Sequence, residues 1–81
     1  MPSNYKQEVI DKPDHYVKNH ERETIETLKG DCTTEEFRGH LVCQVKRYLS
    51  RYKYKGDPQK ELAKAQWYLN RLIKEVSDEA N

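Results

Sequence analysis

The sequence predicts an all-α fold: a small helical domain with an N-terminal arm, a short helix and a long antiparallel helical hairpin. Apolar residues recur every three or four positions through the second half of the chain, as they do on one face of a helix. Helix-start signals precede both of these apolar stretches, at Thr33 and at Asp57. No stretch alternates between apolar and polar residues for long enough to indicate a strand.

The size and composition of the chain favour a single domain, residues 1–81, that assembles as a homo-oligomer. Of its 81 residues only 35% are hydrophobic while 36% are charged, so the core of one chain is thin. Small domains supplement such a core with disulfides, a metal or oligomerisation. Two cysteines, Cys32 and Cys43, do not make a disulfide framework, and reduced thiols fit a cytosol. We therefore expect a dimer or a tetramer.

The N-terminal half begins with an arm, residues 1–20, that carries two prolines and shows no apolar period. It has no apolar leader segment, and nothing approaches the roughly 18 apolar residues of a membrane span, so we expect an intracellular protein without a membrane partner. A short helix over 22–29 follows, with Ile25 and Leu28 on one face and Gly30 as its stop.

The hairpin consists of a helix over 34–54 and a helix over 58–77. Thr33 and Glu36 form a capping box before the first helix, and the sequence KGDP ends it. Asp57 caps the second helix and Pro58 suits its first position. Each helix carries one apolar stripe, which we expect to face the core. The stripe of the first helix is Phe37, Leu41, Val45, Tyr48, Leu49 and Tyr52. The stripe of the second helix is Leu62, Ala65, Leu69, Leu72, Ile73 and Val76.

The segment Gln44–Gly56 has five cationic residues, three tyrosines and no acid, whereas acids lie on both sides of it. His40, Gln44, Arg47 and Arg51 fall on one helix face, at the edge of the apolar stripe. Guanidinium groups in such a place suit a bound phosphate, and Tyr48 and Tyr52 offer surfaces on which a base could stack. The alternative stays open: the arginine stems cover the core while their charged heads remain in water.

Trp67 is the second unusual feature, because it lies on the opposite side of its helix from the leucines. Its neighbours there include Ala63 and Arg71, and a large aromatic beside a small residue is typical of a subunit interface. The alternative is that the first helix or the N-terminal arm covers Trp67.

Two further kinds of site are not predicted. The sequence does not predict a metal site, because the possible ligands lack the close paired spacing of zinc ligands: His15, His20, Cys32, His40 and Cys43. It does not predict a glycine-rich phosphate loop either, because the chain has only three glycines and contains neither GxxxxGK[ST] nor GxGxxG.

Three stretches give the chain a resemblance to a known family. "DHY" near the start, "IE" in the first helix and "YLSRYKYKGDPQKELAKAQWYLNRLI" resemble the small SaV-like phage and prophage proteins. The same domain occurs in a podovirus nucleotide kinase that lacks a P-loop. The resemblance spans about residues 12–73. Gln44 stands where the family pattern has Asn and Arg47 where it has Lys, while Cys43 and Lys46 depart from it.

The resemblance implies a phage protein that handles nucleotides. The first hypothesis is a protein that sequesters cyclic oligonucleotide immune signals, such as cyclic dinucleotides, in the cytoplasm of an infected bacterial host. It blocks antiviral defence without catalysis and without a cofactor. The ligand-binding residues in this hypothesis are His15, Tyr16, Gln44, Arg47, Tyr48, Arg51 and Lys55.

The second hypothesis is a deoxynucleoside monophosphate kinase without a P-loop, which would use ATP and Mg²⁺ with Asp14 or Glu26 as the acidic group. A third is a helical inhibitor of a host protein, anchored by Trp67. Nucleic-acid binding is disfavoured because the net charge is only +1. Whether the protein is an enzyme stays open at this point.

Overall fold

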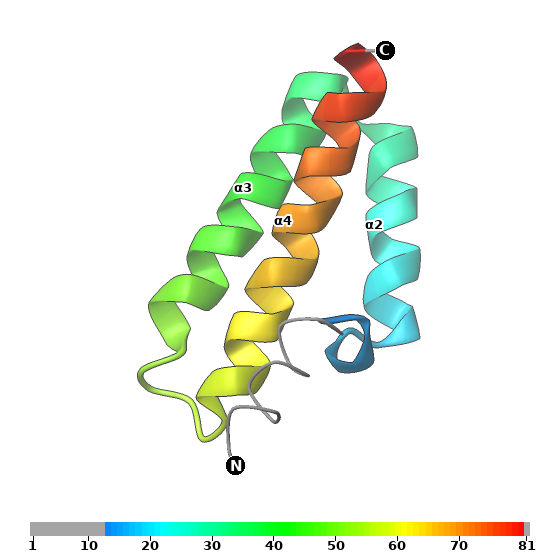
Figure 1. The fold of residues 1–81 in the computed structure, drawn as a ribbon. Helices are drawn as coiled ribbons and strands as arrows, with labels where there is room; N and C mark the ends of the chain where they lie inside the picture. The colour runs from blue at the N-terminus through cyan, green and yellow to red at the C-terminus, as the bar shows by residue number, and fades with distance from the viewer. Residues whose placement is uncertain (1–12, 81) are drawn as a thin grey trace.

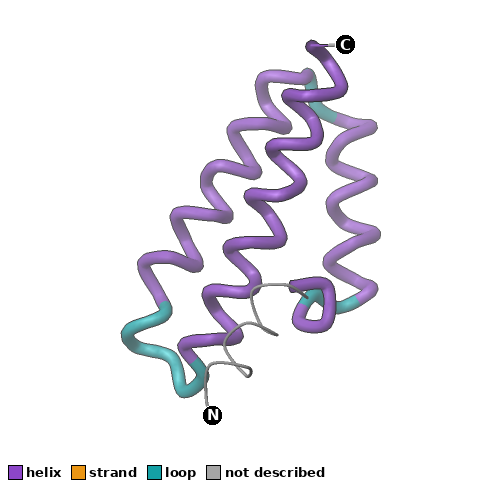
Figure 2. Tube along the Cα trace, in the orientation of Figure 1, coloured by secondary structure: helices purple, strands orange, loops and turns teal. Residues whose placement is uncertain are grey.

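Helices account for all the regular structure in the computed structural model, which describes residues 13–80 (Figure 1). A short 3₁₀-helix, η1 (Pro13–Tyr16), precedes α2 (Asn19–Asp31), α3 (Thr34–Arg51) and α4 (Pro58–Ala80). The three α-helices run up, down and up, and the described part of the chain contains no strand (Figure 2). The all-α prediction is thus confirmed. None of the described helices is long and apolar enough to cross a bilayer.

The starts of α3 and α4 follow the predicted capping signals. The Thr33 hydroxyl accepts a hydrogen bond from the Glu36 amide at 3.1 Å, and the Glu36 carboxylate accepts one from the Thr33 amide at 2.8 Å. At the start of α4, the Asp57 carboxylate accepts a hydrogen bond from the Lys60 amide at 3.1 Å. These bonds satisfy amides that have no partner inside the helix, which fixes both starting points.

The helix ends differ more from the predicted bounds. α2 begins within the predicted arm and runs through Gly30, and it ends where the Cys32 amide donates to the Leu28 carbonyl. α3 stops three residues early, at Arg51, whose carbonyl accepts hydrogen bonds from two amides of the following turn. α4 continues to Ala80, beyond the predicted end at residue 77. Of the predicted arm, residues 1–12 lie outside the described residues, while 13–16 form η1.

The core lies where α3 packs along α4, with one side closed by α2. Its centre is a pair of stacked rings, Tyr48 of α3 and Tyr68 of α4, whose centroids are 5.7 Å apart at 15°. Trp67 meets the edge of Tyr68 at 4.9 Å and 84°. Six buried residues from the three helices form this core: Ile25, Phe37, Leu41, Tyr48, Ala65 and Tyr68.

The predicted apolar stripe of α4 is only partly in the core, which corrects the sequence-based assignment. Ala65 and Leu72 pack inward, but the rest of the stripe faces outward, together with Leu49 of α3. The inner face of α4 is instead made by residues a quarter of a turn away, including the buried Glu61 and Tyr68. The apolar side chains left between 38% and 54% exposed are Leu49, Leu62, Leu69, Ile73 and Val76.

Arg22 of α2 holds η1 in place. Its Nε donates to the Val17 carbonyl at 3.2 Å, and its Nη2 donates to the Asp14 carbonyl. Pro13 and Val17 are buried at this end of the molecule, where η1 packs against α4. The N-terminal segment therefore covers part of the α4 face that carries Trp67.

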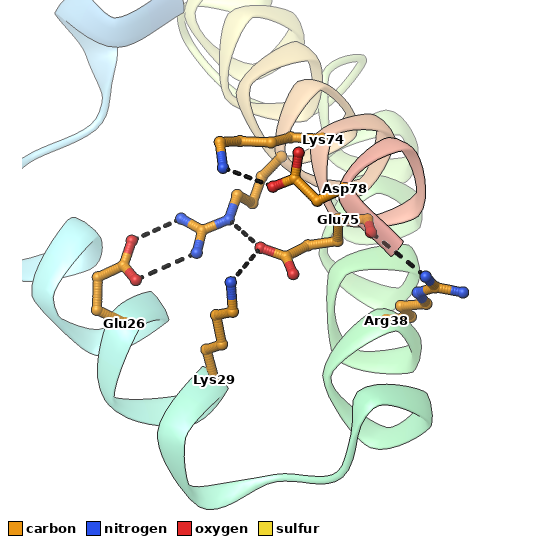
Figure 3. A network of polar contacts seen from close by, with 7 residues as sticks. Glu26, Lys29, Arg38, Lys74, Glu75 and Asp78 are labelled. Atoms are coloured by element: carbon orange, nitrogen blue, oxygen red, sulfur yellow. Dashed lines mark hydrogen bonds and ion pairs between the residues drawn. The ribbon is translucent and has the colours of Figure 1, made fainter. Parts of the chain in front are cut away.

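An ion-pair network joins α2 to α4 near the other end of the bundle (Figure 3). Arg71 binds both carboxylate oxygens of Glu26, at 2.6 and 3.1 Å, and its Nε donates to Glu75 at 2.8 Å. Lys29 of α2 donates to the same Glu75 carboxylate at 3.1 Å. The Arg71 hydrogen bond lowers the pKa of Glu26. Burial raises the pKa of Glu75, but hydrogen bonds from Arg71 and Lys29 outweigh it and the net pKa is lowered.

Removal of the α3 cap will destabilise the protein measurably. We expect Thr33→Ala to lower the free energy of unfolding by about 1 kcal/mol, because the Glu36 amide loses the Thr33 hydroxyl that accepts its hydrogen bond. Thr34→Ala, the same change one residue later at an exposed position, should stay within about 0.5 kcal/mol. Urea unfolding followed by circular dichroism measures both, and equal losses would contradict the capping role.

Acid will weaken the tie between α2 and α4. The folded-state pKa of Glu26 lies below its ordinary value of 4.5, so its contribution is present above that pH and is lost as pH falls through the folded pKa. The contribution is below about 1 kcal/mol, since the Glu26 side chain is 64% exposed. The free energy of unfolding can be measured with urea from about pH 6 down to about pH 3, a range that brackets the ordinary pKa of a glutamate. It should therefore fall less steeply with pH in Glu26→Gln than in wild type.

The matched control for this titration is Glu23→Gln, an exposed carboxylate on the same helix that makes no ion pair within residues 13–80. It should keep the wild-type slope. If Glu26→Gln also kept that slope, the network would not contribute to stability.

Candidate functional site

A shallow hollow of about 170 Å³ lies between α2, α3 and α4. Three of the four residues predicted to share one polar arc of α3 meet there: His40, Gln44 and Arg47. Because α2 approaches this arc, residues of α2 complete the wall opposite α3. The full lining is His20, Glu21, Thr24, Ile25, His40, Gln44, Arg47, Tyr48 and Tyr68.

The polar arc on α3 is held loosely. The Gln44 amide nitrogen lies 3.5 Å from His40 Nε2, and Arg47 Nη1 donates to the Gln44 oxygen at 3.4 Å. Both distances are at the long limit of hydrogen bonding, so these contacts are weak. A ligand in the hollow could therefore take over the Arg47 and Gln44 side chains at small cost.

The opposite side of the hollow carries a carboxylate. Tyr68 Oη donates a hydrogen bond to Glu21 Oε2 at 3.1 Å. Burial raises the pKa of Tyr68, and the neighbouring Glu21 charge raises it further, so the hydroxyl keeps its proton and acts as a donor. Glu21 repels an anion on this side and suits an N–H donor group. The hollow is therefore polarised, with a cation on the α3 wall and an acid on the α2 wall.

Three cations surround the buried Tyr48 ring beside the hollow. The charged groups of Arg47 and Arg51 each lie 5.3 Å from the ring centroid, and the Lys64 ammonium lies 5.5 Å from it. Each contact is within cation–π range. Within residues 13–80, Arg47 and Lys64 make no ion pair, so their charge is available to an anion.

Arg51 differs from these two because it is paired. Its Nε lies 3.3 Å from Glu61 Oε1, and the two side chains are 28% and 8% exposed. The pair does not meet hydrogen-bond geometry, and these two atoms have no other partner in the part of the chain described. Arg51 thus pairs with Glu61 by charge without a hydrogen bond, and it compensates a buried carboxylate. Its predicted role at a ligand phosphate requires the phosphate to compete with Glu61.

The remaining predicted ligand residues lie in different places. Tyr48 contributes to the hollow but is only 4% exposed, with Tyr68 stacked on its ring, so a base could not stack there without moving a neighbour. Lys55 is exposed in the α3–α4 turn. His15 is exposed and Tyr16 half-buried in η1, and neither lines the hollow. Their predicted contacts with a ligand stay predictions.

The predicted interface residues lie on the α4 face toward η1. Ala63 is 1% exposed within the single chain, and Trp67 is half-buried. Trp67 and Arg71 line a second hollow, of about 180 Å³, with Asp14, Asn70 and Lys74. These contacts match the alternative in which the N-terminal segment covers Trp67, and the interface role stays a prediction.

The two acids considered for Mg²⁺ lie near Arg71 instead of the first hollow: Asp14 lines the second hollow, and the Glu26 carboxylate is bound by Arg71. Among the described residues, no group of three His, Cys, Asp or Glu side chains could hold a metal.

Three residues around Tyr48 were not predicted from the sequence: Glu21, Lys64 and Tyr68. Glu21 in the hollow and Lys64 over the Tyr48 ring gave no signal in the sequence, because only the packing of α2 and α4 brings them to this place. Tyr68 did give one: it follows Ala65 by three residues and precedes Leu72 by four, which is the spacing of a buried helix face. The predicted buried face of α4 contained the exposed leucines Leu62 and Leu69 instead, and so left Tyr68 out.

Loss of Arg51 will damage the fold before it affects any ligand. We expect Arg51→Ala to lower the free energy of unfolding by about 3 kcal/mol, because it leaves the Glu61 charge buried and unpaired. Arg47→Ala should cost no more than about 1 kcal/mol, the worth of one cation–π contact. The double change Arg51→Met with Glu61→Leu should restore most of the loss in urea unfolding. A destabilised double variant would show that another interaction is involved.

The comparisons with known proteins give one match. The DUF3310 family, described as proteins of unknown function, matches residues 10–70, about three quarters of the chain. Comparisons with curated proteins and with solved structures give no match. The matched range includes most of the stretch that resembles SaV-like proteins but carries no such name, so that resemblance stays a prediction. With its three helices and polarised hollow, this chain belongs to the DUF3310 family.

Proposed function

We propose that this protein binds nucleotides and sequesters cyclic oligonucleotide immune signals, such as cyclic dinucleotides, without converting them. The observation that carries the proposal is the position of Arg47: it lines the hollow, makes no ion pair within the described residues and lies beside two further cations. The resemblance to phage proteins that handle nucleotides supports the same ligand class. In this proposal the protein acts in the cytoplasm of an infected bacterial host.

Charge favours a phosphate on the α3 side of the hollow. An arginine offers a planar fork of donors that matches two phosphate oxygens. Arg47 needs only to release one weak bond to Gln44 before it can bind in this way. Lys64 and Arg51 raise the local potential, while Glu61 offsets one of their charges. The Arg47 side is therefore the anion side of the proposed site.

The α2 side of the hollow suits a base edge. Glu21 accepts from Tyr68 and has a second carboxylate oxygen for a base N–H group. His40 and Gln44 add donors and acceptors between the two walls. A nucleotide would thus lie across the hollow, with its phosphate at α3 and its base toward Glu21.

The size of the hollow limits what one chain can enclose. Its volume of about 170 Å³ is below the roughly 300–1,000 Å³ of small-molecule pockets. One chain would hold one phosphate and part of a base, so a cyclic dinucleotide would extend beyond it. This favours a homo-oligomer, a dimer or tetramer, in which two chains hold one ligand. Sequestration requires only tight binding, with no group placed for catalysis.

Arg47→Ala tests the proposal by calorimetry with a panel of cyclic dinucleotides and trinucleotides. We expect the wild type to bind at least one of them with a submicromolar Kd, and Arg47→Ala to weaken it at least tenfold, which is about 1.4 kcal/mol. The matched control is Lys46→Ala, which removes a cation from the adjacent exposed position outside the hollow and should change Kd less than twofold.

Two results would overturn the proposal. Equal weakening by the two variants would indicate nonspecific attraction of anions. Turnover of a deoxynucleoside monophosphate with ATP and Mg²⁺, lost in Arg47→Ala, would favour the kinase over sequestration. Small molecules released from the heated, purified protein, identified by mass spectrometry, would name the ligand directly.

A further inference from the structure

The outward face of α4 carries an apolar stripe with the spacing of a coiled-coil seam. Its positions follow one another by four, three, four and three residues, which places them at alternating a and d sites of a heptad. Four are aliphatic and lie between 38% and 54% exposed, and the fifth is a glutamine at an a site. We call these residues the α4 seam: Leu62, Gln66, Leu69, Ile73 and Val76.

The α4 seam continues onto α3. Leu49, which is 48% exposed, and the half-buried Val45 line one hollow of about 250 Å³ together with Leu62 and Leu69. Scattered exposed apolar side chains are ordinary, but a contiguous patch that spans two helices marks an interaction surface. This patch, formed by α3 and α4 together, is therefore a candidate interaction surface.

Its chemistry points to a helical protein partner. The e and g sites that flank the α4 seam between residues 62 and 77 are Ala63, Ala65, Asn70, Leu72 and Ser77, none of which is charged. A helix that lies on a membrane surface presents aromatic residues on its apolar side and lysines or arginines beside it. The α4 seam has neither, so close helix packing suits it better than a lipid surface.

The hollow and the most exposed side chains lie at opposite ends of the α4 seam. The hollow lies toward the start of α4, lined by Leu62 and Leu69, whereas the two most exposed side chains of the α4 seam, Ile73 and Val76, lie toward the end of the helix. A twofold axis near Leu69 with the helices antiparallel lays the protruding end of each copy over the hollow of the other. The hollow exceeds the roughly 150 Å³ that accepts a benzene-sized group, so it has room for such side chains.

The dimensions of the patch fit a modest dimer. From Leu62 to Val76 the α4 seam is about 21 Å long at 1.5 Å per residue, and two packed helices are about 20 Å wide. This gives a flat footprint of about 400 Å² on each copy, which rises when the relief of the side chains is included. Standard interfaces bury about 800 Å² per partner, so the flat footprint is about half of that and corresponds to a small, weak interface.

We propose that a second copy of this chain occupies the patch, forming a twofold dimer in which the two α3–α4 hairpins make a four-helix bundle. Such an interface is isologous, with the same surface on both copies. The hollow lined by Arg47 shares no residue with the patch, so this dimer leaves each hollow open, and a ligand held by two chains would join two such dimers into a tetramer. The proposal does not depend on the proposed function, because dimerisation is measured without a nucleotide.

Sedimentation velocity over a range of protein concentrations tests the dimer. We expect the wild type to pass from 9.7 kDa to twice that mass with a micromolar Kd. Ile73→Asp puts a charge into the α4 seam and should weaken association at least a hundredfold, with helicity by circular dichroism unchanged because Ile73 is outside the core. Lys60→Asp, on the opposite face of the same helix, should leave association within twofold.

Two outcomes would overturn the proposal. One is a wild-type chain that stays at 9.7 kDa up to several hundred micromolar, roughly a hundred times the Kd expected of a small interface. The other is an oligomer that survives both Ile73→Asp and Leu69→Asp but dissociates in Trp67→Ala, which would place the interface on the Trp67 face of α4.

Discussion

The packing of α3 along α4 is the contact on which the other parts of this structure depend. The centre of that contact is the Tyr48–Tyr68 stack, which brings a large ring from each helix into a core short of aliphatic residues. Stacked rings bury much area per residue, so two tyrosines can replace several leucines. The helix caps at Thr33 and Asp57 then fix where each helix begins along this contact.

The same stack connects the core to the candidate site. The charged groups of Arg47, Arg51 and Lys64 lie over the buried Tyr48 ring, so the position of this ring sets where these cations sit. Two similar arginines end in different roles. Arg51 compensates Glu61 and supports the fold, while Arg47 extends to the hollow and keeps its charge free of an ion pair within the described residues.

α4 has to satisfy neighbours on several sides at once. It packs its inner face on α3, receives η1 on the Trp67 side, and is tied to α2 through Arg71. Each contact uses a different set of residues around the helix. The α4 seam is the apolar face left over, and its exposure in a single chain is the physical reason to propose a second copy.

The sequence by itself determined that the chain is helical and where α3 and α4 start, because these depend on local signals: the Thr33–Glu36 capping box, Asp57 before Pro58, and the apolar period. It also placed His40, Gln44 and Arg47 on one face, since helix geometry alone fixes that arc. The predicted end of α2 was two residues early because Gly30 is only a weak stop, and the predicted end of α3 was three residues late.

Only the tertiary structure decided which apolar face of α4 turns inward, because two faces had helical periodicity and the choice depends on how Tyr68 fits against Tyr48. It alone brought Glu61 to Arg51 and Glu21 to the hollow. These pairs join residues far apart in the chain or on separate helices, so no local pattern encodes them.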